Sequence, residues 1–167
     1  GKDIKRLETI ADRFSKIGSK PELINTDIII FITNLINYLK SRMPAKTEFA
    51  LNTPKEAVEA PINSTLFAWV IENLVKNAVD AMKGKGKIII AISESETDII
   101  INIHDNGDGI DKSIIKNIFK PGVTSKKRGW GLGLSLSKRI IEEYHNGAIF
   151  VMESKKKIGT TFTIQLP

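Results

Sequence analysis

The chain has 167 residues, 41% of them hydrophobic and 26% charged, which is enough to bury the core of one domain of ordinary size. It has no cysteine and two histidines, so a disulfide framework, a thiolate metal site and a histidine-rich metal centre are excluded. The net charge is +6, but the basic residues fall in separate short clusters rather than in one stripe with aromatic residues between them, so we expect no nucleic-acid partner.

The apolar residues do not form a membrane-spanning segment. The longest apolar run covers residues 28–32, far short of the ~20 residues that a spanning helix needs, and the first residues show no signal-peptide pattern. We therefore expect this chain to make no membrane contact and to be cytoplasmic. Because it begins with Gly1 rather than Met, we expect it to be a fragment, and its parent protein can still be anchored in a membrane.

An amphipathic helix is predicted over residues 2–17, where apolar side chains recur at three- and four-residue steps. Gly18 and Pro21 end this helix. A lone helix of this length is marginal in water, so its apolar seam must pack against another element. We expect residues 1–20 to be the C-terminal end of a longer, truncated helix with its linker, and residues 21–167 to form the domain.

Two further amphipathic helices follow. Asp27 is expected to cap the first, which runs to about residue 42. Asn63 and Ser64 can cap the second, which has the most regular helical pattern in the chain and ends before Gly84. These side chains share the apolar face of the second helix: Leu66, Phe67, Val70, Ile71, Leu74, Ala78 and Ala81.

Strands are predicted from alternating and β-branched residues over 47–51, 57–60, 87–92, 97–104, 148–154 and 160–166. Residues 93–96 form the turn between two of them. A helix over residues 131–145 ends at Asn146 and Gly147, before the last strand pair. Adjacent strand pairs outnumber strict β-α-β alternation, which favours an α/β two-layer sandwich with a mixed, mostly antiparallel sheet.

Polar residues form a stripe on the helix that follows Asn63, at steps of one, three and four residues. They are Glu72, Asn73, Lys76, Asn77 and Asp80. The stripe can be plain solvated surface, but asparagine is a poor helix former and has no propensity reason to occur there twice. An amide oxygen is a hard ligand that Mg²⁺ accepts beside waters and phosphate oxygens, so we predict Asn77 as a metal ligand. Glu72 can accept a proton or orient an attacking group.

A glycine-rich segment, Asp105-Asn106-Gly107-Asp108-Gly109, follows a predicted strand. Alone it indicates a plain turn, because Asn-Gly and Asp-Gly are strong turn dipeptides. A carboxylate can also accept a hydrogen bond from the exocyclic amine of adenine, and glycines let the backbone approach a flat base. Beside the polar stripe, this segment predicts Asp105 as the residue that binds adenine.

Two more segments suit phosphate binding, and a third is a candidate turn. Glycines within residues 129–134 precede a helix, where backbone N–H groups favour an anion. Residues 119–128 resemble a mobile flap, from which Lys126 can reach a phosphate. Gly159 and Thr160 indicate only a hairpin turn when taken alone.

In this order the segments resemble the sequence boxes of the ATP-binding catalytic domain of sensor histidine kinases, within the GHKL superfamily shared with gyrase, a heat-shock chaperone and mismatch-repair ATPases. The resemblance covers residues 27–167. The matching boxes are residues 72–78, the N box; 105–109, the first glycine box; 118–122, the phenylalanine box; 129–134, the second glycine box; and 159–162, the last. It implies a Bergerat-type fold, in which helices cover one face of a mixed sheet and a flap lies over ATP.

The resemblance also implies a site for Mg²⁺ and ATP or ADP. Glu72, Asn73 and Lys126 are its catalytic positions, with Asn77 as the metal ligand. The nucleotide-binding positions are Asn73, Lys76, Asn77, Asp80, Asp105, Gly107, Gly109, Ile110, Phe119, Lys126, Gly129, Gly131, Leu132, Gly133, Leu134 and Thr160. Many such kinases carry Lys and an aromatic residue where this chain has Asp80 and Ala81, so Lys126 must contribute more of the positive charge.

The histidine that accepts the phosphoryl group is expected outside this chain. Such a residue should be exposed on a helix beside an acid, whereas His104 ends a strand and His145 ends a helix, so both are interpreted as structural. The expected partners are the dimerisation and phosphoacceptor domain of the same protein and the receiver domain of a response regulator. Three alternatives stay open: an ATPase clamp in which Glu72 activates water, a serine kinase of the same superfamily, and a basic module that binds polyanions.

Overall fold

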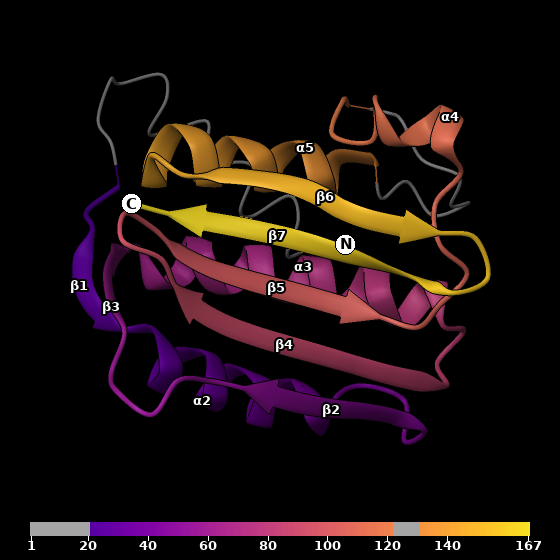
Figure 1. Ribbon diagram of the computed structural model, residues 1–167, viewed down its shortest axis with the longest axis horizontal. Coiled ribbons are helices and arrows are strands. Elements are labelled where there is room, and N and C mark those ends of the chain that lie inside the picture. The colour runs from indigo at the N-terminus through magenta and orange to yellow at the C-terminus, as the bar shows by residue number, and fades with distance from the viewer. Residues whose placement is uncertain (1–20, 122–130) are drawn as a thin grey trace.

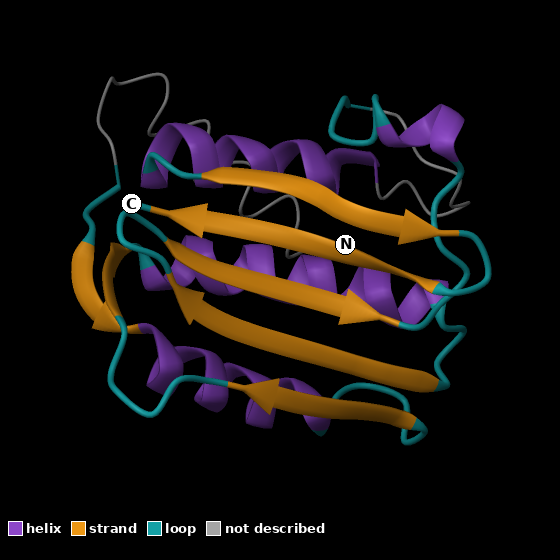
Figure 2. Cartoon of the chain, in the orientation of Figure 1, coloured by secondary structure: helices purple, strands orange, loops and turns teal. Residues whose placement is uncertain are grey.

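The computed structural model describes residues 21–121 and 131–167, and for residues 131 and 132 it describes the backbone alone. The described chain forms two sheets and a layer of helices (Figure 2). Its strands are β1 (Ile24–Asp27), β2 (Thr47–Asn52), β3 (Glu59–Ile62), β4 (Gly86–Glu94), β5 (Ile99–Asp105), β6 (Ala148–Lys155) and β7 (Gly159–Leu166). Its helices are α2 (Ile28–Lys40), α3 (Ser64–Ala81), α4 (Lys112–Ile115) and α5 (Gly131–Arg139), which continues as the π-helical turn η1 (Ile140–Tyr144).

The larger sheet has the strand order β2-β4-β5-β7-β6. Strands β2 and β4 are parallel, and the other neighbouring pairs are antiparallel. Helices α2, α3 and α5 lie on one face of this sheet, and within the described residues no helix covers the opposite face (Figure 1). The predicted two-layer sandwich with a mixed, mostly antiparallel sheet is therefore confirmed.

Both long helices begin where the sequence predicts. The Asp27 carboxylate accepts a hydrogen bond from the Ile30 N–H at 3.0 Å, and Asn63 Oδ1 accepts one from the Leu66 N–H at 3.1 Å. Each cap therefore occupies a backbone donor that has no partner inside the helix. Among the helices of residues 21–121 and 131–167, none has the length and apolarity needed to cross a membrane.

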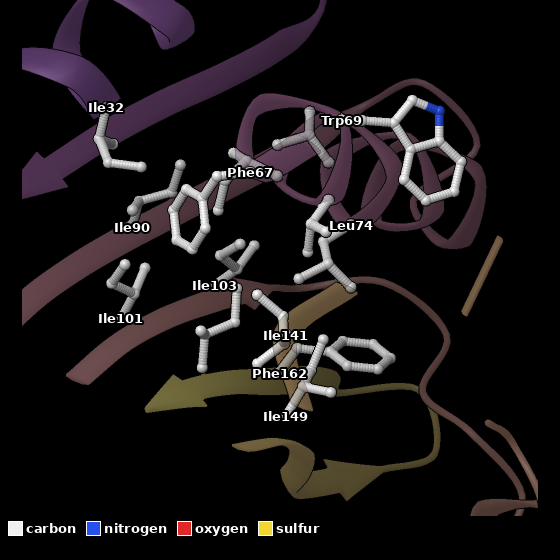
Figure 3. Packing of buried hydrophobic residues seen from close by; sticks show 14 of the residues in the cluster. Ile32, Phe67, Trp69, Leu74, Ile90, Ile101, Ile103, Ile141, Ile149 and Phe162 are labelled. Carbon is white, nitrogen blue, oxygen red and sulfur yellow. The ribbon is translucent and has the colours of Figure 1, made fainter. Parts of the chain in front are cut away.

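The hydrophobic core fills the space between the sheet and the helices (Figure 3). In β5 every second residue is buried, and Ile101 and Ile103 face the same side as Ile90 of the neighbouring strand β4. Helix α3 adds Phe67 and Leu74, both of which are buried. Full burial of each such side chain contributes about 1.5 to 3 kcal/mol relative to exposure. This packing fixes the position of α3 on the sheet.

The small sheet of β1 and β3 differs from the prediction. The sequence predicts a strand over residues 57–60, whereas β3 covers Glu59–Ile62 and pairs antiparallel with β1, for which no strand is predicted. The four residues of β1 lack apolar alternation, so only the pairing with β3 makes them a strand. The turn between β4 and β5 also shifts from residues 93–96, because it is closed by the Ser95 N–H donating to the Asp98 carbonyl at 2.8 Å.

Strand β6 contains a bulge. Val151 and Glu153 lie opposite consecutive residues of β7, so Met152 is an extra residue in β6. Beyond the bulge, Ser154 pairs with Thr160 and shares its side of the sheet. Since side chains alternate along a strand, Ser154 would face the opposite side of the sheet if the same residues paired without the bulge.

Candidate nucleotide-binding site

Helix α3 carries the predicted polar stripe along the side that meets α5 and the loop after β5. Asn73 is only 4% exposed, Asn77 is partly exposed and Asp80 is exposed, so the stripe runs from the interior toward solvent. The Glu72 carboxylate lies 3.5 Å from Lys76 Nζ, in an ion pair between successive turns of the helix. Because both side chains are partly exposed to water, this pair adds little stability. The burial of Asn73 is the feature that the helical pattern did not predict.

Helix α5 touches α3 at Asn73. The Asn73 side-chain Nδ2 donates a hydrogen bond to Ser137 Oγ at 3.2 Å, and Ser137 Oγ donates to the Gly133 carbonyl at 2.7 Å. A Cβ on Gly133 would lie 2.5 Å from Asn73 Oδ1, so any larger residue would have to displace the Asn73 amide. Leu134, the next predicted site residue, is buried.

The loop after β5 meets the C-terminal end of the same helix. Asp105 is only 3% exposed, and its Oδ1 accepts a hydrogen bond from the Gly107 N–H at 2.9 Å. A Cβ on Gly107 would lie 2.6 Å from the Ala81 carbonyl carbon, and the Asp108 N–H donates to the Ala81 carbonyl at 3.0 Å. Gly109 has a φ of 77° and lies against the β6 backbone. These glycines are therefore required by contacts with protein backbone, whatever ligand the loop binds.

The two contacts lie on one side of α3. Asn73, Asn77 and Ala81 follow each other at four-residue steps, which brings their side chains to the same helix face. The contact of Gly133 with Asn73 and that of Gly107 with Ala81 are therefore about 12 Å apart along the helix axis, with Asn77 midway. This arrangement suits a ligand with a flat end at the loop after β5 and an anionic end at the start of α5.

The β6–β7 hairpin supports the loop after β5. Thr160 is buried and pairs with Asp105 across β7 and β5. Its Oγ1 lies 2.8 Å from Ser154 Oγ, which accepts a hydrogen bond from the Ile110 N–H at 2.7 Å. Gly159 has a φ of 149°, and a Cβ there would collide with the Asp105 carbonyl oxygen. The hairpin thus brings Asp105, Thr160 and Ile110 together, and Ser154 lies between Thr160 and Ile110.

Phe119 is the first residue of the predicted flap. Its half-buried ring meets Phe162 of β7 edge-on, with ring centroids 6.2 Å apart, and Lys138 Nζ of α5 lies 5.7 Å from its centroid. These contacts hold Phe119 against the sheet and α5. Two predicted phosphate-binding positions lie outside the described residues: Lys126 and Gly129. Of two more the structure gives only the helical backbone: Gly131 and Leu132.

The contacts of both histidines fit a structural role. His145 is buried; its Nδ1–H donates to the Ile140 carbonyl at 2.9 Å, and its Nε2 accepts from the Asn63 N–H at 3.0 Å. Burial lowers the pKa of His145, although the Ile140 carbonyl acts in the opposite direction. His104 faces the open side of the sheet, with its Nδ1 2.8 Å from Thr161 Oγ1. Neither residue is an exposed imidazole along a helix.

The structure adds two serines to the candidate site that were not predicted from the sequence. Ser137 links α5 to Asn73, and Ser154 links Thr160 to the Ile110 backbone. The only sequence signal for Ser137 is its position four residues after Gly133, inside a glycine- and leucine-rich helix. Ser154 carries no such signal, because the bulge in β6 reverses the side it would face.

Comparison with known proteins gives consistent matches. Sporulation kinase D of Bacillus subtilis strain 168 is 43% identical over 98 residues, which cover 59% of this chain and 19% of that kinase. The chain spans less than a fifth of the length of this relative and also of the histidine-protein kinase AtoS of Escherichia coli K12, of which it covers 18%. Among solved structures, the catalytic domain of histidine kinase ThkA superposes with a TM-score of 0.79 at 28% identity, covering 87% of this chain and 95% of that domain.

The family model that matches is described as histidine kinase-, DNA gyrase B- and HSP90-like ATPase, and it covers residues 63–167. That range begins at the cap of α3 and includes the asparagine stripe, the loop after β5, the start of α5 and the β6–β7 hairpin. The match therefore contains every element of the candidate site. The chain belongs to the histidine kinase-, DNA gyrase B- and HSP90-like ATPase family.

Proposed function

We propose that this chain is the Mg²⁺·ATP-binding catalytic domain of a two-component sensor histidine kinase. The proposal rests on one observation. Two glycine-containing segments contact one face of α3 through Gly133 and Gly107, on either side of Asn77. The ends of this face differ in chemistry, because a buried carboxylate stands at one end and the start of a helix at the other. The similarity to the catalytic domain of ThkA supports the kinase within the wider ATPase family.

The adenine end of the site is assigned to the loop after β5. The Asp105 carboxylate would accept a hydrogen bond from the exocyclic amine of adenine, with its position set by the Gly107 N–H. Thr160 lies opposite Asp105, and Ser154 holds its hydroxyl. Gly107, Gly109 and Ile110 would form the backbone wall beside the base, because the loop that contains them packs against α3 and β6.

The phosphate end is assigned to the start of α5. Backbone N–H groups of residues 131–134 would face phosphate oxygens, and Lys126 would add positive charge from the flap. Asn77 fits Mg²⁺, since its amide oxygen is a hard donor on the partly exposed middle of the helix face. Bound Mg²⁺ would neutralise charge on the phosphates, and Asn73, Lys76 and Asp80 would border that region.

Phosphoryl transfer needs a histidine from outside the described chain. An imidazole nitrogen of that histidine would attack the γ-phosphorus, the bond to the bridging oxygen would break, and ADP would leave with that oxygen. Catalysis of this step depends mainly on positioning and charge stabilisation. Glu72 lies one residue before Asn73 and would orient the incoming group, although it is paired with Lys76 at 3.5 Å in the structure.

The proposed partners are the domains that would supply the acceptor histidine and then receive the phosphoryl group. Residues 1–20 would end the helical hairpin that carries the acceptor histidine, and a receiver domain of a response regulator would take the phosphoryl group next. ThkA has been solved in complex with response regulator protein TrrA, with a TM-score of 0.76 at 25% identity over 99% of this chain and 48% of that kinase chain. We propose a cytoplasmic location, where ATP and receiver domains are available.

The proposal is tested by mixing this chain with labelled ATP, Mg²⁺ and a separately made helical hairpin from the same parent protein. Acid-labile label on the hairpin is expected, and a hairpin with its acceptor histidine changed to Gln serves as the control. No transfer to the intact hairpin, with nucleotide binding retained, would contradict the kinase assignment. Steady phosphate release would then favour an ATPase clamp, and acid-stable label on a partner would favour a serine kinase.

A further inference from the structure

Ser137 connects the two helices that form the phosphate end of the proposed site. It is the fourth residue after Gly133 in α5, and it is 0% exposed. Its Oγ lies 2.7 Å from the Gly133 carbonyl oxygen and 3.2 Å from Asn73 Nδ2. The hydroxyl therefore contacts both the first turns of α5 and the buried amide of α3.

The donors and acceptors of this contact leave one consistent arrangement. A carbonyl oxygen can only accept, so the single hydroxyl proton of Ser137 is donated to Gly133. The Ser137 oxygen must then accept from Asn73, which only the nitrogen end of that amide can provide. The amide of Asn73 is fixed with Nδ2 toward Ser137 and Oδ1 beside Gly133.

We infer that Ser137 is a positioning residue for nucleotide binding: it sets the orientation of the Asn73 amide and the position of the first turns of α5 relative to α3. This inference rests on the proposed function, because it concerns the phosphate end of that site. Ser137 itself is buried and touches no bound group; it acts through Asn73 and the Gly133 carbonyl. Without the hydroxyl, the amide loses its acceptor and can turn over.

The chain offers a matched control. Thr163 in β7 is 2% exposed and donates a hydrogen bond to Asn102 Oδ1 at 2.6 Å. This is again a buried hydroxyl paired with an asparagine amide, but both residues lie on the sheet face away from the helices. Changes at this pair report the general cost of losing a hydroxyl without touching the proposed site.

The first experiment is a double-mutant cycle read by calorimetric titration with Mg²⁺ and a non-hydrolysable ATP analogue. Ser137→Ala is expected to weaken binding about three- to tenfold, the effect of one lost hydrogen bond. In an Asn73→Ala background the same change should have little further effect, because the residue on which Ser137 acts is gone. Thr163→Ala should leave affinity within twofold. Unchanged affinity in Ser137→Ala, or equal losses in both backgrounds, would overturn the inference.

The second experiment needs no nucleotide. The side-chain amide signals of Asn73 in a ¹⁵N–¹H NMR spectrum are identified by their absence in Asn73→Ala. They should shift in Ser137→Ala, stay in place in Thr163→Ala, and shift less in Ser137→Cys, whose thiol is a weaker hydrogen-bonding group. Signals that do not move in Ser137→Ala would overturn the orienting role. Absence of nucleotide binding by the unchanged protein would instead contradict the proposed function, and the spectra would still test the amide orientation.

Discussion

Gly159 lies directly against the carbonyl oxygen of Asp105, so closely that no Cβ can be placed between them. The two residues come from the start of β7 and the end of β5, which are neighbouring antiparallel strands. The tip of the β6–β7 hairpin is therefore seated on the strand end that carries the proposed adenine-binding carboxylate. Stability of the fold and geometry of the site depend on the same contact.

Gly159→Ala is expected to lower the free energy of unfolding by at least about 2 kcal/mol, because it combines a positive φ with a backbone collision. Chemical denaturation measures this change. Gly84→Ala is the control, since Gly84 has a φ of 78° but its nearest atoms, in Pro44, would be 3.4 Å from a new Cβ. Gly84→Ala should cost about 1 kcal/mol. Equal costs at the two positions would show that the Asp105 contact adds nothing.

Asp105→Asn should weaken ADP and ATP binding by about 1 to 3 kcal/mol with little loss of stability. The amide keeps an Oδ1 that can accept from the Gly107 N–H, so the loop is retained while the negative charge is removed. Calorimetric titration and a thermal melt measure the two effects separately. Asp98→Asn, at the opposite end of the β4–β5 hairpin, should bind nucleotide normally. Wild-type affinity in Asp105→Asn would remove this residue from the adenine site.

Asn77→Ala is expected to act on the metal rather than on the base. The ratio of ATP affinities measured with Mg²⁺ and with EDTA should fall by about tenfold or more, because the amide oxygen is the proposed protein ligand. Asn37→Ala, an exposed asparagine on α2, controls for the gain in helix propensity. If the Mg²⁺ dependence survives in Asn77→Ala, the metal is held by other groups.

Stability should depend on pH through His145. Burial lowers its pKa in the folded protein, whereas in the unfolded chain the pKa returns to about 6.5. The unfolded state therefore binds more protons in this range, so the stability is fully present above pH 6.5 and is lost as the pH falls toward the folded pKa. Protonation would also place an N–H of His145 against the Asn63 N–H.

Urea denaturation of the protein and of His145→Gln between pH 5 and pH 8 isolates this effect, since every other titrating group is common to both. The difference in unfolding free energy between the two proteins should shrink as the pH falls below about 6.5. A constant difference across the range would mean that His145 titrates alike in both states.

The sequence predicted those helices and strands that are determined by neighbouring residues along the chain. The Asn63 cap and the apolar spacing after it locate α3, and the β-branched residues before Asp105 locate β5. The stripe with Asn77 and the loop with Gly107 could be placed on these elements, so much of the candidate site was predicted. The roles assigned to its residues stay predictions.

The remaining features depend on tertiary contacts. Asn73 was predicted beside the buried face, and its burial requires the approach of α5, which Gly133 permits. Ser137 becomes important only when that approach brings it to Asn73. Strand β1 exists because β3 pairs with it, although its own residues have weak strand propensity.

The bulge in β6 decides which functional group lies beside Thr160. With Met152 inserted, a neutral hydroxyl from Ser154 takes that place, and the Glu153 carboxylate is turned to the open side of the sheet. If β6 kept Met152 but paired with β7 without the bulge, Glu153 would lie opposite Thr160 and bring a second anion close to Asp105. A single backbone irregularity on an outer strand thus keeps like charges apart at the proposed purine end of the site.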